Sequence, residues 1–198
     1  MKPIRVGTAQ FEARDGDKAY NLDVIARLTA QAKGEGAELV CFHECSIGGY
    51  TYLETLDRAG LDAVAEEVPE GPSIQRLIGI ARDVGVSIGA GLIERADGRL
   101  YNTYAVVSPE GLVARHRKIH AFVNDALSCG DSYTVFDHLG CRIGILICYD
   151  NNLPENGRMT ALLGADIILA PHVTGCLPSA MPGRGTVTPE VCHNLELH

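Results

Sequence analysis

Residues 144–158, GILICYDNNLPENGR, join an apolar run of strand length to a polar segment, and Cys148 stands at the junction. The apolar run predicts a buried strand that starts near Cys141, and residues 156–163 have the pattern of a short helix. A strand followed at once by a helix is typical of an α/β protein. The stretch therefore predicts a thiol at the end of a strand. This thiol is a packing residue, a metal ligand or a nucleophile.

The segments around this stretch predict the same class of fold. Residues 4–11 and 37–42 are β-rich, and residues 18–33 between them have helical spacing, so the two strands are expected to be parallel neighbours in a βαβ unit. The other predicted strands are 86–93, 100–107, 112–119, 133–136, 141–147 and 166–170, and the other predicted helices are 54–67 and 72–84. Residues 1–172 are expected to form one domain, and residues 173–198 a Gly/Pro-rich tail without helix or strand.

Composition excludes several classes of protein. The chain has 198 residues, 46% of them hydrophobic, and a net charge of −8, with no basic run of the kind that binds nucleic acid. Apolar runs are too short for a membrane span, and the N-terminus lacks the apolar stretch of a signal peptide, so a cytoplasmic protein is expected. The seven cysteines are odd in number and lack CxxC spacing, which favours reduced thiols and no metal site.

Three reactive side chains stand at the ends of predicted strands. Glu44 follows residues 37–42, Lys118 closes residues 112–119, and Cys148 ends the strand described above. Ends of adjacent strands lie near one another, so the three are expected to converge. A thiolate is nucleophilic, a carboxylate can move protons, and an ammonium with the backbone N–H of Tyr149 can hold an oxyanion. This combination permits acyl transfer through a thioester, and a nearby ammonium and helix N-terminus are expected to lower the pKa of the thiol.

Each of these residues also has a structural interpretation. Cysteine is commonly buried as a small apolar residue, so Cys148 alone indicates core packing. Lys118 belongs to the basic cluster RHRK, which is typical of a solvated strand face, and Glu44 is compatible with a local cap. His43, His120 and His172 leave open a metal site or a Cys–His dyad, although they lack ligand spacing.

The motifs taken together resemble the nitrilase superfamily of carbon–nitrogen hydrolases. They stand in the family's order: VGTAQF, LVCFHE, YNTYAVVSPEG, RKIH, GILICYD and PENGR…LLGADIILAP. The resemblance covers roughly residues 4 to 172 and implies a four-layer αββα sandwich. It also implies Glu44 as the base, Lys118 as the oxyanion lysine and Cys148 as the nucleophile. Its further implications are no metal or organic cofactor, a small-molecule amide or nitrile substrate, and a homodimer or larger homo-oligomer.

The sequence CYD at residues 148–150 resembles amidase-type members, which favours a small amide or carbamoyl amide over a nitrile. His43 stands where many members have proline. The second glutamate that many members carry after the lysine has no counterpart within residues 119–154, and Asp125 is the candidate substitute. Family members are longer, so a C-terminal truncation and an incomplete second sheet are expected.

Three alternatives to amide hydrolysis stay open at this point. The same three residues are compatible with nitrile hydrolysis. A glutaminase-like module is a second reading, although the chain contains no synthetase domain to receive ammonia. The third is an inactive remnant that keeps the fold and acts as a binding or assembly protein.

Overall fold

The N-terminal part of the chain forms the predicted βαβ unit. In the computed structural model, which describes residues 3–173, 179–181 and 185–187, β1 (Val6–Ala9) and β2 (Leu39–Phe42) flank helix α1 (Lys18–Gly34). Asp17 caps this helix, because its side chain accepts a hydrogen bond from the backbone N–H of Tyr20. The two strands pair in parallel, from Val6 opposite Leu39 to Ala9 opposite Phe42, which confirms the prediction.

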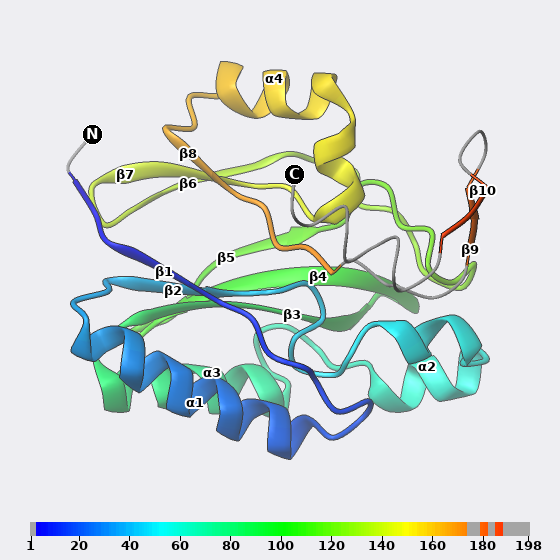
Figure 1. Ribbon diagram of the computed structural model, residues 1–198, viewed down its shortest axis with the longest axis horizontal. Coiled ribbons are helices and arrows are strands. Elements are labelled where there is room, and N and C mark those ends of the chain that lie inside the picture. The colour runs from blue at the N-terminus through cyan, green and yellow to red at the C-terminus, as the bar shows by residue number, and fades with distance from the viewer. Residues whose placement is uncertain (1–2, 174–178, 182–184, 188–198) are drawn as a thin grey trace.

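Five strands form the first sheet, in the order β1-β2-β3-β4-β5. The remaining three are β3 (Ser87–Ala96), β4 (Arg99–Ser108) and β5 (Gly111–Arg117), which follow one another as antiparallel neighbours. Helices α1 and α3 (Pro72–Val84) cover one face of this sheet (Figure 1). Buried aliphatic side chains fill the space between these helices and the sheet, among them Ile25, Ile74, Leu77, Ile88 and Val107.

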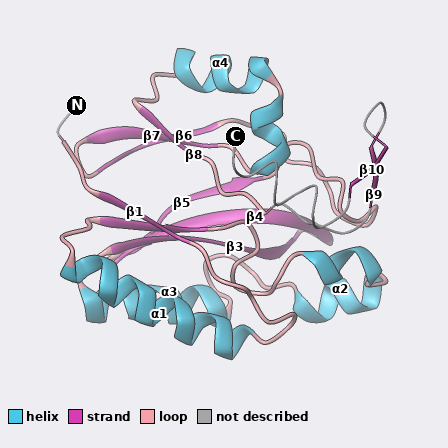
Figure 2. Cartoon of the chain, in the orientation of Figure 1, coloured by secondary structure: helices cyan, strands magenta, loops and turns pink. Residues whose placement is uncertain are grey.

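A second sheet packs on the other face of the first. Its strands are β6 (Thr134–His138), β7 (Cys141–Ile145) and β8 (Ile167–Leu169), and α4 (Pro154–Leu162) covers its outer side (Figure 2). The core between the sheets joins residues of both, including Leu39, Tyr104, Val106, Ile143 and Ile145. The layers are therefore helix, sheet, sheet and helix, as expected, and the second sheet has three strands in the described part of the chain.

Two expectations for the secondary structure were wrong. The helix predicted over residues 54–67 is divided into a short 3-10 turn, η1 (Thr51–Thr55), and helix α2 (Arg58–Val64). The division occurs at Asp57, whose backbone is extended and whose carboxylate caps α2 by accepting a hydrogen bond from the N–H of Gly60.

Within the described residues no helix combines the length and the apolar character needed to cross a bilayer.

The expected tail without strands is the second error. Strands β9 (Ser179–Met181) and β10 (Gly185–Val187) pair in antiparallel fashion, with Gly185 opposite Met181. The pattern GRGTV offers little alternation of apolar and polar residues, so a strand of this length gives no periodic signal. The rest of the tail lies outside the described residues.

Two glycines in β3 allow close packing against neighbouring segments. A Cβ atom at Gly89 would lie 2.7 Å from the hydroxyl of Tyr104. A Cβ atom at Gly91 would lie 2.3 Å from the backbone nitrogen of Cys45 and 3.1 Å from the carbonyl carbon of Glu44. The strand therefore approaches the segment that carries Glu44 backbone to backbone, and a side chain at Gly91 would displace that segment.

Gly91→Ala is expected to destabilise the protein by about 1–3 kcal/mol, because the added methyl group meets backbone atoms that cannot rotate away. Urea unfolding measures this change. Gly79→Ala is the matched control, since Gly79 lies within α3 and a Cβ there meets nothing within 4 Å. The control should be neutral or slightly stabilising. Equal unfolding midpoints for the two variants would contradict the close approach.

Candidate active site

The three residues predicted to converge come from both sheets. Glu44 follows β2 and Lys118 follows β5 in the first sheet, and Cys148 begins the 3-10 turn η2 (Cys148–Asn152) after β7 in the second sheet. The exposed fractions of the three residues are 0%, 1% and 7% respectively. The strand ends thus bring a carboxylate, an ammonium and a thiol into one buried region between the sheets.

The carboxylate of Glu44 is asymmetric in its contacts. Its Oε1 accepts hydrogen bonds from Lys118 Nζ and from Asn102 Nδ2, each at 2.7 Å. Its Oε2 is buried and has no hydrogen-bond partner among the described residues. One oxygen is therefore held by two donors, and the other keeps its lone pairs for a further proton.

Cys148 adopts a backbone conformation that is unusual for a residue other than glycine. Its φ is 49°, in the left-handed region, and its backbone N–H donates to the carbonyl of Pro171 at 2.9 Å. Such a turn at the end of a strand fixes the direction of the side chain. Cys45, next to Glu44, has the same φ of 49°, so both chain segments turn sharply where they enter the site.

The expected lowering of the thiol pKa was wrong. Burial and, after it, the charge of Glu44 raise the pKa of Cys148 to about 11, against the opposing charge of Lys118. The ammonium of Lys118 is paired with Glu44 and η2 has only five residues, so Lys118 offsets only part of the effect of burial and of Glu44 on the thiol pKa. The resting group is therefore a neutral thiol.

This raised pKa predicts the order in which thiols react. Cys129 is exposed, so a small neutral thiol reagent without an amide, such as methyl methanethiosulfonate, should modify Cys129 before Cys148 at pH 7. The rate at Cys148 should rise with pH towards about 11. Peptide mapping by mass spectrometry after brief treatment gives both rates. Preferential modification of Cys148 at pH 7 would mean that its thiolate is stabilised instead.

Asp150 ties the segment of Cys148 to the segment of Lys118. Its Oδ1 accepts from the backbone N–H of His120 at 2.9 Å, and its Oδ2 accepts from those of Ile119 and Ile147, each at 3.2 Å. Burial alone would raise the pKa of Asp150, but these bonds and the nearby His116 hold it below its usual value. The aspartate of the CYD motif therefore joins the two sheets next to the site.

An aromatic rim of Tyr50, Phe122 and Tyr149 lies beside Lys118. The ring of Phe122 is centred 4.9 Å from Lys118 Nζ and that of Tyr50 5.8 Å, and the rings of Phe122 and Tyr149 are 5.4 Å apart. Phe122 and Tyr149 are 58% and 42% exposed, so the rim reaches solvent. Tyr149 directly follows Cys148, which places its backbone N–H beside the thiol-bearing residue.

Asp125, the candidate second acid, lies apart from this cluster in the contacts it makes. It is an exposed turn residue, and in the described part of the chain no hydrogen bond or ion pair joins it to Glu44, Lys118 or Cys148. The nearby residue that does contact Glu44 is Asn102, which sequence reasoning missed. The sequence did indicate such a contact, because the Asn of YNTY lies in a predicted buried strand and a buried side-chain amide needs a hydrogen-bond partner.

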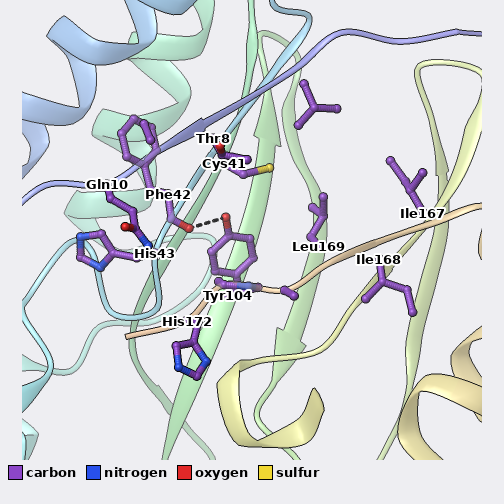
Figure 3. A pocket seen from close by; sticks show the side chains of 14 residues that line it. Thr8, Gln10, Cys41, Phe42, His43, Tyr104, Ile167, Ile168, Leu169 and His172 are labelled. Atoms are coloured by element: carbon purple, nitrogen blue, oxygen red, sulfur yellow. Dashed lines mark hydrogen bonds between the residues drawn. The ribbon is translucent and has the colours of Figure 1, made fainter. Parts of the chain in front are cut away.

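Two hollows lie near the site, although neither is lined by Glu44, Lys118 or Cys148. The first has a volume of about 690 Å³ and lies between β1 and β8, and in it the hydroxyl of Tyr104 donates to the carbonyl of Phe42 at 2.8 Å (Figure 3). The second, of about 520 Å³, is lined by Tyr50 and Val173 among others. His43 lines both hollows, and its Nδ1 lies 3.0 Å from the carbonyl oxygen of Glu44. Both volumes are within the usual range for small-molecule sites.

The whole pattern corresponds to a known family. The family model described as carbon-nitrogen hydrolase matches residues 5–194. The chain belongs to the carbon-nitrogen hydrolase family. Residues Glu44, Lys118 and Cys148 all lie within the matched region.

Curated relatives of this carbon-nitrogen hydrolase include a nitrilase and an amidase. The chain is 36% identical to a nitrilase of Pyrococcus abyssi, over 91% of this chain and 70% of that protein. It is 34% identical to an (R)-stereoselective amidase of a Pseudomonas species, over 84% of this chain and 59% of that protein. The chain thus spans between about three fifths and seven tenths of the length of these relatives.

A solved structure is similar over most of the described fold. It is a variant of the amidase from Nesterenkonia sp. AN1, with covalent addition of the acetamide moiety of fluoroacetamide at the active site cysteine of that enzyme. The TM-score is 0.72 and the identity 26%, and the match covers 85% of this chain and 64% of the other. The nitrilase-type sandwich is thereby identified as the fold of this chain.

Proposed function

We propose that this protein hydrolyses the carbon–nitrogen bond of a small amide through a thioester on Cys148. The observation that carries the proposal is the free Oε2 of Glu44 beside a neutral thiol whose pKa is about 11. A thiol of this kind needs a local base, and a carboxylate with one unoccupied buried oxygen supplies one. Membership of the carbon-nitrogen hydrolase family supports the same reaction class.

In the first half-reaction, Glu44 Oε2 takes the proton of the Cys148 thiol as the sulfur attacks the amide carbonyl carbon. The carbonyl π electrons move to oxygen, and Lys118 Nζ and the backbone N–H of Tyr149 hold the resulting oxyanion. When the carbonyl re-forms, the C–N bond breaks and Glu44 returns the proton to the leaving nitrogen. The products are ammonia or an amine and a thioester on Cys148.

In the second half-reaction, Glu44 takes a proton from water as the water oxygen attacks the thioester carbon. The same two donors hold the second oxyanion. The C–S bond then breaks, the sulfur takes the proton from Glu44, and the carboxylic acid leaves. Lys118 serves both steps as a hydrogen-bond donor, and its hydrogen bond to Glu44 Oε1 keeps the ammonium in place.

The CYD sequence at residues 148–150 and the similarity to amidases favour amide hydrolysis over nitrile hydrolysis. The free oxygen of Glu44 is compatible with either substrate, because the nitrogen of each must receive a proton before it leaves as ammonia. The aromatic rim of Tyr50, Phe122 and Tyr149 favours short acyl chains with apolar or planar groups.

Release of ammonia from matched substrates tests the proposal. Propionamide and butyramide are compared with propionitrile and butyronitrile, and a carbamoyl amide is included as a third class. Ammonia from the amides at a higher kcat/KM than from the nitriles is the expected result. Turnover of the nitriles alone would replace the proposal by nitrile hydrolysis. No turnover of any class by a natively folded chain would favour the inactive binding protein.

A further inference from the structure

We propose that Asn102 is a positioning residue that decides which oxygen of Glu44 acts as the base and fixes Lys118 beside it. This inference rests on the proposed function, because it assigns Asn102 a role in that reaction. Asn102 lies in β4 opposite Ile93 of β3 and is 1% exposed, so its contacts are those of the protein interior.

Asn102 contacts both charged residues of the site. Its Nδ2 donates to Glu44 Oε1 at 2.7 Å, and its backbone carbonyl accepts from the backbone N–H of Lys118 at 2.8 Å. Its Oδ1 accepts from the thiol of Cys45 at 3.6 Å. The thiol is a donor in this contact, so the oxygen of the amide faces Cys45 and the nitrogen faces Glu44. One residue therefore sets the position of a carboxylate and of the lysine that pairs with it.

The role follows from the cost of burying a charge. A buried carboxylate is stable only when donors satisfy it, and an ion pair with a single lysine would leave Glu44 free to exchange its two oxygens. The amide of Asn102 provides a second, directional donor to Oε1, which leaves Oε2 as the oxygen without a partner. Asp125, the acid expected to help position these residues, makes no hydrogen bond or ion pair to Glu44 in the described structure.

Two substitutions of Asn102 keep the backbone bond to Lys118 and remove the side-chain donor. Asn102→Ala should lower kcat for an amide by about 10- to 100-fold, because one hydrogen bond to a charged group is lost. Its KM should change less, since the side chain is buried beneath Glu44. Asn102→Asp has the same shape but sets a second carboxylate against Glu44, so the acid limb of its kcat–pH profile should move to higher pH by about one unit.

Asn21→Ala is the matched control. Asn21 is also buried, and its Nδ2 donates to the backbone carbonyls of Arg14 and Ile47, outside the site. This variant should lose stability and keep the kcat–pH profile of the unmodified protein. If both Asn102 variants behave like Asn21→Ala, with lower stability and an unmoved pH profile, Asn102 is structural and the inference is wrong.

A measurement without turnover separates this inference from the proposed function. The rate at which methyl methanethiosulfonate modifies Cys148 is followed against pH, and in Asn102→Asp this profile should move to higher pH because an added negative charge disfavours the thiolate. A moved profile in a protein that hydrolyses no amide would support the positioning role and overturn the proposed function. If the protein hydrolyses amides and the pH profiles do not move in either Asn102 variant, the proposed function is supported and the positioning role is overturned.

Discussion

Replacing Cys148 with alanine is expected to lower amide turnover by roughly four to six orders of magnitude, the loss seen when a covalent nucleophile is removed. The other thiol near the site, that of Cys45, is 1% exposed and donates to Asn102 Oδ1, so Cys148 is the residue expected to form the thioester. Stopped-flow or discontinuous assays of ammonia release measure the residual rate. The substitution removes only one sulfur atom and keeps the Cβ atom of residue 148, so the unfolding midpoint should change little.

The control for this prediction is an exposed cysteine. Cys129→Ser changes a thiol that is accessible and outside the cluster of Glu44, Lys118 and Cys148, so it should keep its turnover. Cys148→Ser should be nearly as inactive as the alanine variant, because a hydroxyl is a weaker nucleophile than a thiol with the same base. Turnover by Cys148→Ala within tenfold of the unmodified protein would show that Cys148 is a packing residue.

The parts of the fold that could be predicted are those in which local pattern and packing agree. The βαβ unit has a capped helix between two apolar runs, and parallel pairing follows from that order. The helix expected over residues 54–67 failed because Asp57 offers its carboxylate to a new helix start, which a composition average does not detect. A helix cap depends on one contact between two residues, and the average composition of a segment does not show that contact.

The site was predictable in its residue types and less so in its electrostatics. Glu44, Lys118 and Cys148 stand at strand ends, and sheet geometry brings strand ends together. The contact of Asn102 with Glu44 depends on how β4 lies against the segment after β2, and no spacing along the sequence encodes it. The pKa of Cys148 depends on its burial and on the charges around it in the folded protein, where burial and Glu44 together outweigh the ammonium of Lys118.

Glu44→Gln is expected to lower kcat by roughly two to four orders of magnitude, the usual contribution of a general acid and base. Glutamine has the same shape, and its carbonyl oxygen can accept from Lys118 and Asn102 as Oε1 does. Its amide nitrogen would then occupy the position of Oε2, where it donates a proton and cannot take one from Cys148. Both half-reactions should slow, and the acid limb of the kcat–pH profile should disappear.

A loss of stability would confuse this result, because removing one member of a buried ion pair costs about 3–5 kcal/mol. Glu94→Gln is the matched variant. Glu94 is also fully buried and accepts hydrogen bonds from Thr103, Arg115 and Arg117, so it should lose comparable stability in urea. It should keep its acid limb, since it lies outside the proposed chemistry. If kcat falls equally in the two variants and both profiles keep their shape, Glu44 supports the fold and the base must be sought elsewhere.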